Sequence, residues 1–351
     1  MKAVSKTASS VLRFWKVIQS SQVTIYDVAE KAGVSPATVS RVLNAPEKVA
    51  EKKRQLVLDV IKELNFVPKA DAVINARKTY KKIAVIAPFF TQPSFMQRLR
   101  GVAEVLAPEH YELVVYSIGT TVDLNNYVTS LVVQKRVDGL ILFCVQINEQ
   151  MQELLKSSGF PVCFVEQVYD DFDCIVIDNK KGGKTAAEYF YKLGCRKPGF
   201  IGEKSYLDYS VPATEDRLSG YKKFFASKGI EIAPQNIWLG EFADDKLDAG
   251  INAYLKQADE LDCVFCSSDL IATRFFYLAR QKGIKCPEQV KILGFDDIDI
   301  SQYVGLSSID QHLEESGRQA AQQILERIGN PDKSAISIKL PLHVVERSTT
   351  C

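Results

Sequence analysis

Residues 24–44 read TIYDVAEKAGVSPATVSRVLN, and this stretch holds two short helical patterns joined by a glycine. Thr24 and Asp27 form a capping pair that predicts a first helix from Ile25, because a hydroxyl and a carboxylate satisfy free backbone N–H groups at a helix N-terminus. Gly33 supplies the left-handed residue that ends this helix. Ser35 then caps a second helix, with Pro36 in its first position. The stretch therefore predicts two helices separated by a tight turn.

The second predicted helix has an apolar side and a polar side. Its buried face is made by Val39, Val42 and Leu43. The side chains left to project outward are Ala37, Thr38, Ser40, Arg41 and Asn44. A third helix, roughly Glu51 to Leu64, is expected to close a small core with Leu56, Val57, Val60, Ile61 and Leu64. Such an arrangement is a DNA-binding helix-turn-helix, and the agreement of caps, turn and outward polar residues favours it over an arbitrary three-helix bundle.

The same residues carry a resemblance to a known family. DVAEKAGVSPATVSRVLN (27–44), Val49 and ELNFVPKA (63–70) resemble the N-terminal domain of the LacI/GalR family of bacterial transcriptional regulators, and the resemblance continues over nearly all of residues 23–350. It implies a small all-α helix-turn-helix domain followed by an α/β core of two Rossmann-like subdomains, similar to periplasmic sugar-binding proteins with three crossovers. It also implies a homodimer that binds an operator in double-stranded DNA and a small-molecule effector.

Within this resemblance, Ala37 and Arg41 are expected to reach base edges, and arginine is the best bidentate donor to guanine. Pro36 and Ala37 stand where some family members carry two large polar readers, so fewer hydrogen bonds to bases are expected from this edge. The residues expected mostly to hold phosphates are Thr24, Tyr26, Ser35, Thr38, Ser40 and Asn44.

The hinge of the family corresponds to KADAVINARKTYKK (69–82). In this resemblance, the position of the leucine that wedges into the minor groove falls on Asn75. An amide can hydrogen-bond in the groove but cannot act as an apolar wedge. Ile74 or Val73 would substitute only through a change of register, so the standard hinge mechanism is not carried over.

Charge is distributed unevenly along the 351 residues, whose net charge is only +1. The first 82 residues hold 16 basic and 7 acidic side chains, whereas the remaining 269 hold 28 basic and 36 acidic ones. A basic head on an acidic body is expected to bind nucleic acid at one end only. Residues 1–22 fit three interpretations: a disordered basic tail, a short amphipathic helix, or an artefact of an upstream start. They lack the uninterrupted apolar core of a signal peptide.

Eight cysteines are present, mostly inside apolar strand patterns such as GLILFCV (139–145) and PVCFV (161–165). The pair Cys263 and Cys266 has zinc-like spacing but lies in a strand pattern, CVFCSSD, without a second pair. We therefore expect no metal site, no cofactor and reduced thiols, which together with the absence of a membrane-spanning run indicate a cytoplasmic protein.

From Lys82 onward, short apolar runs alternate with amphipathic helical patterns, as in parallel sheets covered by helices. The expected strands are 82–89, 111–119, 139–145, 161–167, 174–179, 197–203, 237–242, 263–269 and 291–297. The expected organisation is an extension (1–22), a helix-turn-helix domain (23–68), a hinge (69–82), a first subdomain (83–179 plus 306–331) and a second subdomain (180–305 plus 332–351). Crossovers are expected near Asp178–Lys180, near Gly305–Asp310 and near Asn330–Ser334.

Open α/β sheets bind ligands beyond the carboxyl ends of their strands, so the site is expected in the cleft between the subdomains. Asp296 ends a strand and offers a carboxylate to hydroxyls, while Arg217 matches a family arginine that donates to the effector. For each, a salt bridge or a cap is the alternative interpretation. Phe95 and Phe242 are expected to stack on the effector, with a place in the core as the equal alternative. The remaining expected effector residues are Ser268, Asp269 and Gln311.

Taken together, the pattern predicts a ligand-responsive transcriptional regulator, most consistent with a repressor controlled by a sugar or sugar derivative. A sugar-binding sensor or transport protein is the alternative, and the basic head counts against it. An enzyme that uses the α/β sheets is disfavoured because the sequence shows no phosphate loop and no nucleophile-elbow serine, so no catalytic residues are expected. The sequence GKT at Gly183 to Thr185 lacks the glycine that a phosphate loop needs at position 178, where Asp178 stands.

Overall fold

The computed structural model describes residues 23–44, 46–64, 66, 79–204, 207–241 and 244–351. The chain divides into two units between Tyr80 and Lys81, a helical head and an α/β core. The extension 1–22, residues 67 and 68 of the predicted helix-turn-helix domain, and the hinge residues 69–78, with Asn75, lie outside the described residues.

The head contains three α-helices and one 3-10 turn among its described residues: α2 (Ile25–Lys31), α3 (Pro36–Asn44), η1 (Pro46–Lys48) and α4 (Glu51–Glu63). Thr24 and Asp27 make the expected capping box, and Gly33 has a φ of 61°. The Ser35 hydroxyl accepts from the Thr38 N–H at 3.2 Å, which caps α3. The helix-turn-helix prediction is confirmed.

One residue of the predicted head core is exposed. Val57 and Val60 of α4 are buried, whereas Leu56 is 48% exposed, so the prediction for Leu56 is wrong. An α-helix turns by about 100° per residue, which rotates Leu56 off the stripe that Val57, Val60 and Leu64 share. Phe66, just after the helix, is buried in the core cluster instead.

The core contains two six-stranded sheets, one in each lobe. The first sheet has the order β11-β5-β4-β3-β1-β2, with strands β1 (Lys82–Pro88), β2 (Glu112–Ile118), β3 (Gly139–Phe143), β4 (Val162–Val165), β5 (Asp173–Val176) and β11 (Ser337–Lys339). The second has the order β12-β10-β9-β8-β6-β7, with strands β6 (Pro198–Glu203), β7 (Ile237–Gly240), β8 (Cys263–Cys266), β9 (Lys291–Asp296), β10 (Ser307–Asp310) and β12 (His343–Val345). The pairings are parallel except that β12 runs antiparallel to β10. The predicted doubly wound α/β fold is confirmed.

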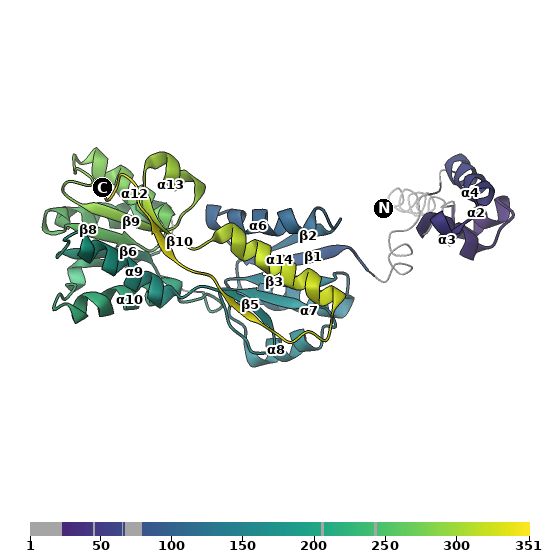
Figure 1. Cartoon of the computed structure of the whole chain (residues 1–351), viewed down its shortest axis with the longest axis horizontal. Coiled ribbons are helices and arrows are strands. Elements are labelled where there is room, and N and C mark those ends of the chain that lie inside the picture. The colour runs from purple at the N-terminus through teal and green to yellow at the C-terminus, as the bar shows by residue number, and fades with distance from the viewer. Residues whose placement is uncertain (1–22, 45, 65, 67–78, 205–206, 242–243) are drawn as a thin grey trace, which may run out of the picture. The chain divides into compact units, whose positions relative to one another are not determined.

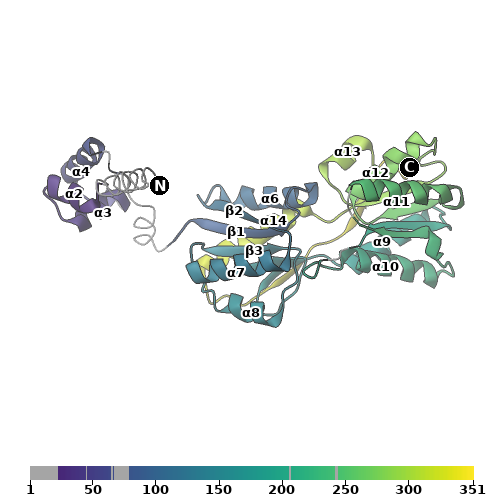
Figure 2. The ribbon, with the colours of Figure 1, turned by 180° about the vertical axis from the view of Figure 1, so that it is seen from behind.

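Helices cover both faces of each sheet (Figures 1 and 2). In the first lobe, α6 (Pro93–Leu106) and α14 (Leu313–Gly329) pack on one face, and α7 (Thr121–Gln134) and α8 (Glu149–Lys156) on the other. In the second lobe, α9 (Asn179–Lys192) and α10 (Ala213–Ser227) pack on one face, and α11 (Asp244–Tyr254) and α12 (Asp269–Gln281) on the other. The remaining short elements are η2 (Pro234–Asn236), η3 (Leu255–Glu260) and α13 (Asp299–Val304).

Two crossovers lie later in the chain than predicted. β10 belongs to the second sheet, so the chain crosses to the first lobe after Asp310, and residues 306–310 were wrongly assigned to the first subdomain. β11 pairs with β5 in the first sheet, so the last crossover lies between Lys339 and His343, and residues 332–339 were wrongly assigned to the second subdomain.

Hydrogen bonds explain both corrections. The Ser308 hydroxyl of β10 donates to Asp269 Oδ1 at 2.6 Å, which fixes this strand in the second lobe. The buried carboxylate of Asp173, in β5, accepts from Arg327 and from the Ile336 N–H at 3.0 Å. The segment that leads into β11 is therefore held on the edge of the first sheet. The first crossover lies just before α9, as predicted.

The cysteine pair that invited a metal interpretation is structural. Cys263 and Cys266 are both buried in β8 and belong to different core clusters on the two faces of the sheet. Their side chains therefore point away from each other, as alternate faces of a strand require.

In each lobe, two helices that pack against each other approach closely at a glycine: α9 and α10 in the second lobe, and α6 and α14 in the first. In the second lobe, a Cβ added to Gly183 of α9 would lie 1.8 Å from the carbonyl oxygen of Arg217. In the first lobe, a Cβ added to Gly317 of α14 would lie 1.9 Å from the carbonyl oxygen of Arg98. These crossings fix the backbone of two arginines that face the cleft between the lobes.

We expect Gly183→Ala to destabilise the core by at least about 1–3 kcal/mol, because the added methyl meets backbone that cannot rotate away. Urea unfolding of the whole chain measures the loss. Gly329→Ala is the matched control, since no atom is found within 4 Å of its added Cβ. Equal stabilities of the two variants would contradict the close crossing.

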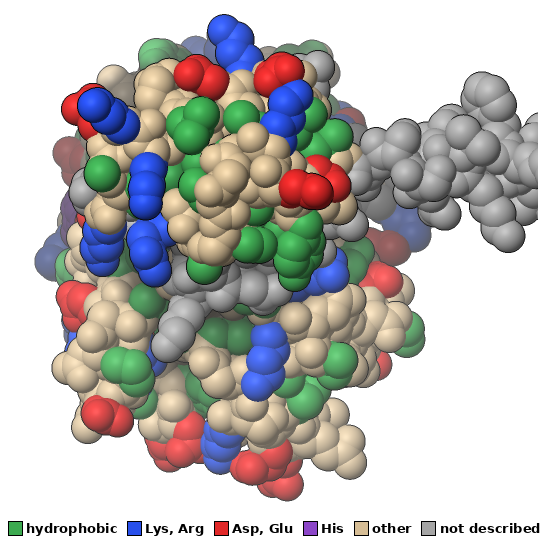
Figure 3. All heavy atoms as spheres, turned by 90° about the vertical axis from the view of Figure 1, so that its right-hand side faces the viewer, with side chains coloured by type: hydrophobic (Ala, Val, Ile, Leu, Met, Phe, Trp, Pro, Cys, Tyr) green, Lys and Arg blue, Asp and Glu red, His purple; other side chains and the backbone are tan. Residues whose placement is uncertain are grey.

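Figure 3 shows acidic and basic side chains interspersed with hydrophobic ones on the face it presents. Among the described residues, none of the helices combines the length and the apolar character needed to cross a membrane.

Candidate functional site

A cavity of about 380 Å³ lies between the two lobes of the core. Its first-lobe wall includes Phe89, Gln92, Phe95, Arg98, Cys144 and Glu166. Its second-lobe wall includes Glu203, Ser210, Thr214, Arg217, Ser268 and Asp296, and Gln311 of the second crossover also lines it. The lobes are joined beside it by the Gln146 N–H, which donates to the Tyr209 carbonyl at 2.7 Å. The cavity has the position expected of a ligand site in this fold.

The first-lobe side of the cavity is organised by a buried ion pair. Arg98 lies on α6, and Glu166 directly follows β4 with a φ of 71°, an uncommon conformation for a residue other than glycine. Arg98 Nη2 donates to Glu166 Oε1 and, at 3.1 Å, to Gln311 Oε1. The two charged side chains are 4% and 6% exposed, so the pair is almost completely removed from water.

The second-lobe side is organised by Arg217. Its Nε donates to Asn179 Oδ1 at 2.8 Å, its Nη1 donates to the Ser267 carbonyl at 2.5 Å, and the guanidinium lies 3.6 Å from the centroid of the Phe295 ring. Asn179 Nδ2 donates in turn to Glu166 Oε2 at 3.4 Å. A continuous polar network therefore connects the two lobes through the cavity wall.

Asp296 ends β9 with a φ of 123° and accepts a hydrogen bond from Gln311 Nε2. Burial raises the pKa of its carboxyl to about 7, although Arg217 and Arg98 act in the opposite direction. Burial also raises the pKa of Glu203, at the end of β6. The cavity thus combines guanidinium forks, carboxyl groups and the ring of Phe95, which suits a small ring that carries hydroxyls.

Some buried polar atoms of this region have no hydrogen-bond partner among the described residues. Arg98 Nε and Ser267 Oγ are buried, and no described residue forms a hydrogen bond with either atom. Buried polar atoms normally have a partner, so a bound ligand or water is expected to supply one.

The structure brings five of the seven predicted effector residues together. Phe95, Arg217, Ser268, Asp296 and Gln311 all line the cavity. Phe242 lies outside the described residues.

Asp269 does not line the cavity, and the structure corrects this prediction. Its side chain is fully buried beneath the site, where Oδ2 accepts from the Ile298 N–H at 3.0 Å and the Ser301 hydroxyl at 2.7 Å. Oδ1 accepts from Ser308. Because both oxygens are used, Asp269 holds the loop after Asp296 in place and has no free edge for a ligand.

The lining or network residues that were not predicted include Arg98, Asn179, Glu166 and Glu203. Glu166 directly follows β4 and Glu203 is the last residue of β6, so the rule that ligands bind at strand ends would have found them. Arg98 stands one helical turn after Phe95, on the same side of α6.

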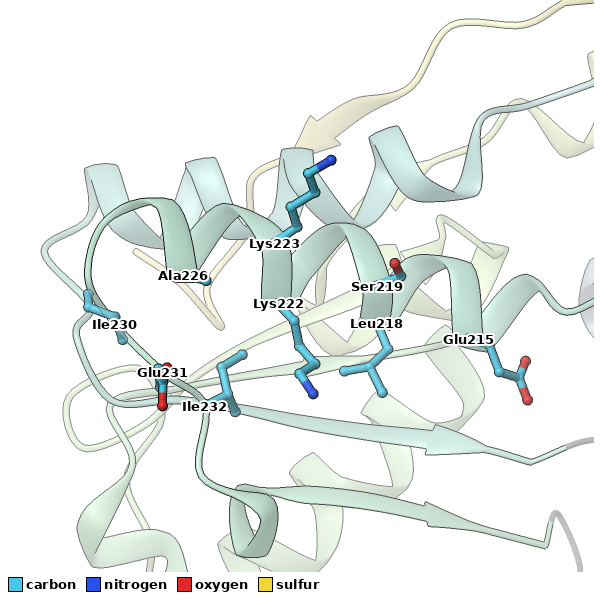
Figure 4. Close-up of a pocket in the computed structure, with 9 residues that line it drawn as sticks. All are labelled: Glu215, Leu218, Ser219, Lys222, Lys223, Ala226, Ile230, Glu231 and Ile232. Atoms are coloured by element: carbon cyan, nitrogen blue, oxygen red, sulfur yellow. The ribbon is translucent and has the colours of Figure 1, made fainter.

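A second, larger groove of about 700 Å³ runs along α10 and the segment from Ile230 to Ile232 (Figure 4). In Figure 4, Lys222 and Leu218 point toward Ile232, whereas Lys223 points to the other side of the helix. Its charged lining residues, such as Glu215, are exposed. Without buried polar groups to orient a ligand, this groove is a weaker candidate than the cleft.

On the head, the predicted DNA-reading residues lie on the surface. Tyr26 is 70% exposed, and Ala37 and Arg41 are exposed on α3. Thr24 and Ser35 are exposed at the caps, whereas Pro36, Thr38 and Ser40 are partly buried. Asn44 ends α3, and its side chain lies outside the described ones.

A helix-turn-helix head on a two-lobed core with an interlobe polar cavity defines a DNA-binding protein with a sensory domain. Comparison with known proteins agrees. The protein-family model for bacterial regulatory proteins of the lacI family matches residues 24–69 of this chain. The family model for the periplasmic binding protein-like domain matches residues 187–350. The chain belongs to the LacI family of bacterial regulatory proteins.

Two similar relatives are repressors. An HTH-type transcriptional repressor PurR of Photobacterium profundum is 30% identical over 313 residues, which cover 87% of this chain and 92% of the relative. The ribose operon repressor of Haemophilus influenzae is 30% identical over 316 residues, which cover 89% and 93%. A crystal structure of a LacI-family transcriptional regulator from Silicibacter pomeroyi is 27% identical, covers 93% of this chain and 99% of that one, and has a TM-score of 0.78. This chain is accordingly a transcriptional regulator and not an enzyme.

Proposed function

We propose that this protein is a cytoplasmic repressor that binds a pseudo-palindromic operator as a homodimer and is controlled by a sugar or sugar derivative in the interlobe cavity. The observation that carries the effector proposal is the polar network from Arg98 through Glu166 and Asn179 to Arg217. The residues of this network come from both lobes. A ligand that forms hydrogen bonds with it therefore has different affinities for different lobe arrangements, and this difference is what allows a ligand to shift the equilibrium between them.

The size and chemistry of the cavity support a small polar effector. A volume of about 380 Å³ is near the lower end of the range of roughly 300–1,000 Å³ for small-molecule sites. Arginine forks and carboxyl groups match vicinal hydroxyls, and Phe95 offers a flat apolar surface to a sugar ring. The name of the ribose operon repressor is consistent with this class of ligand.

The head supports operator binding. Its exposed Arg41 and Ala37 face outward from α3, the helix that enters the major groove in this motif. One head reads one half-site, so a two-fold dimer doubles the interface with DNA. A sugar-binding protein without a regulatory role would have no use for this surface.

Two measurements test the proposal together. Binding to a duplex selected from a random pool is expected to weaken steeply with salt, because phosphate contacts release counterions. A thermal-shift screen of sugars and sugar derivatives is expected to find a compound that raises the melting temperature and changes that duplex affinity. Absence of salt-dependent binding to any duplex would refute the regulator, and a hit without effect on DNA affinity would refute effector control.

We expect effector affinity to rise about tenfold between pH 6 and pH 8. Burial raises the pKa of Asp296 to about 7, and only its carboxylate form accepts two hydroxyl hydrogen bonds. The ionised fraction grows roughly tenfold over this interval. Calorimetric titration of the best screening hit at several pH values measures the slope.

Asp296→Asn is expected to bind more weakly and to lose the pH dependence. Glu231→Gln is the control, since Glu231 is exposed on the groove of α10 and outside the cavity lining. If the slope persists in Asp296→Asn, the titrating group is another carboxyl, with Glu203 the first to examine.

A further inference from the structure

Two of the three histidines of the chain lie together with an aspartate where the chain passes between the lobes. Asp310 is the last residue of β10, His343 is the first of β12, and the two are paired in the antiparallel ladder. His312 follows two residues after Asp310, at the start of α14. His312 Nδ1 lies 3.2 Å from Asp310 Oδ2, and His343 Nε2 lies 3.8 Å from the same oxygen.

These distances fit a shared metal ion. In a tetrahedral zinc site, ligand atoms about 2.0–2.2 Å from the metal lie roughly 3.3–3.6 Å from one another. One potential ligand atom from each of the three residues falls within 4.8 Å of the other two. Small side-chain rotations would therefore bring all three into a common coordination sphere.

The chemistry of the cluster selects the class of ion. Two imidazoles and one carboxylate suit Zn²⁺ and related transition-metal ions, whereas Mg²⁺ and Ca²⁺ prefer oxygen ligands alone. Nδ1 is the His312 ring nitrogen that lies near Asp310, whereas Nε2 is buried and no described residue hydrogen-bonds to it. The His343 side chain is 54% exposed, so an ion and its water ligands can reach the cluster.

We propose that Asp310, His312 and His343 form a binding site for a divalent transition-metal ion, with Zn²⁺ as the matching probe. The site joins two of the three segments that connect the lobes, the one after β10 and the one before β12. Gln311, between two of the ligands, contacts Arg98 and Asp296 in the cavity. The proposal depends only on the cluster and holds whether or not a sugar is the effector.

Isothermal titration of the full chain with ZnCl₂, after chelator treatment, tests the site. We expect saturable binding that is at least tenfold weaker in His343→Asn and in Asp310→Asn. His110→Asn is the control, because His110 is exposed and outside the cluster. His343→Asn is the more informative variant, because the His343 side chain is exposed and its replacement is expected to leave the fold intact.

Cobalt substitution distinguishes this cluster from the thiols. Cys195, Asp262 and Cys263 also bring potential ligand atoms within 4.8 Å of one another. An ion at the histidine cluster is expected to show ligand-field bands without thiolate charge transfer, and those bands are expected to disappear in His343→Asn. Undetectable Zn²⁺ binding, equal affinity in both cluster variants and the wild type, or a thiolate-dominated cobalt spectrum would each overturn the proposal.

Discussion

Replacing Arg41 by alanine is expected to weaken binding to the preferred duplex by roughly 30-fold to 25,000-fold. Each bidentate contact between arginine and guanine contributes about 1–3 kcal/mol, and a homodimer on a two-fold site makes two of them. Arg41 is exposed on α3, while Val39 and Val42 of the same helix are buried, so the substitution removes a surface group and leaves the head core unchanged. Fluorescence anisotropy with a selected duplex and a scrambled one measures affinity and discrimination.

Two further variants separate base reading from charge. Arg41→Lys keeps the positive charge but loses the planar fork, so it is expected to retain the salt dependence of binding and to lose discrimination. Lys53→Ala, on the exposed side of α4, is expected to affect both duplexes alike. Full discrimination by Arg41→Ala would show that another residue reads the bases.

Local patterns predicted the parts of the molecule that short-range chemistry determines. The cap at Thr24, the turn at Gly33 and the start of α3 depend on residues a few positions apart, and all three are present. The central apolar runs of the core form strands that helices bury on both faces, whereas the edge strands β2 and β7 are only partly buried.

What the patterns missed depends on partners far along the chain. Asp269 resembled a ligand residue because it follows a strand, yet its role is set by Ser301 and Ser308 on distant segments. The crossover before β12 was misplaced because the contacts that hold β11, from Asp173 to Arg327 and Ile336, join segments over 150 residues apart. Nothing in the local pattern of residues 337–347 indicates these partners.

The cleft itself was only half predictable for a related reason. Strand ends indicate where side chains gather, and Asp296 was found that way. Side-chain rotamers and distances decide whether two charged side chains at these strand ends pair with each other or remain free to bind a ligand. The spacing of residues in the sequence does not give these rotamers or distances. Glu166 is paired with Arg98 on one side of the cavity, whereas burial raises the pKa of Asp296 despite the nearby guanidinium groups of Arg217 and Arg98. We therefore expect Arg98 and Glu166 to shape the site, and Asp296 to respond most strongly to the ligand.

Arg98→Met is expected to destabilise the core by about 3–5 kcal/mol, because it leaves the Glu166 carboxylate buried without its cation. The carboxylate would retain only the bond from Asn179, and Gln311 would lose the donor to its oxygen. Urea unfolding followed by the fluorescence of Trp238, in a Trp15→Phe background, reports on the core alone, since these are the two tryptophans of the chain.

The loss of stability in Arg98→Met should come more from the unpaired Glu166 carboxylate than from lost packing. Two comparisons separate these causes. Arg98→Met combined with Glu166→Gln removes both charges, so it is expected to recover part of the loss and to yield a coupling energy in a double-mutant cycle. Arg318→Met removes a more exposed arginine that pairs with Glu104 and Glu315, and such surface pairs contribute less than about 1 kcal/mol. If Arg98→Met costs no more than Arg318→Met, water or a rearranged side chain compensates Glu166. The polar network between the lobes would then adjust to a lost charge too easily to couple effector binding to the arrangement of the lobes.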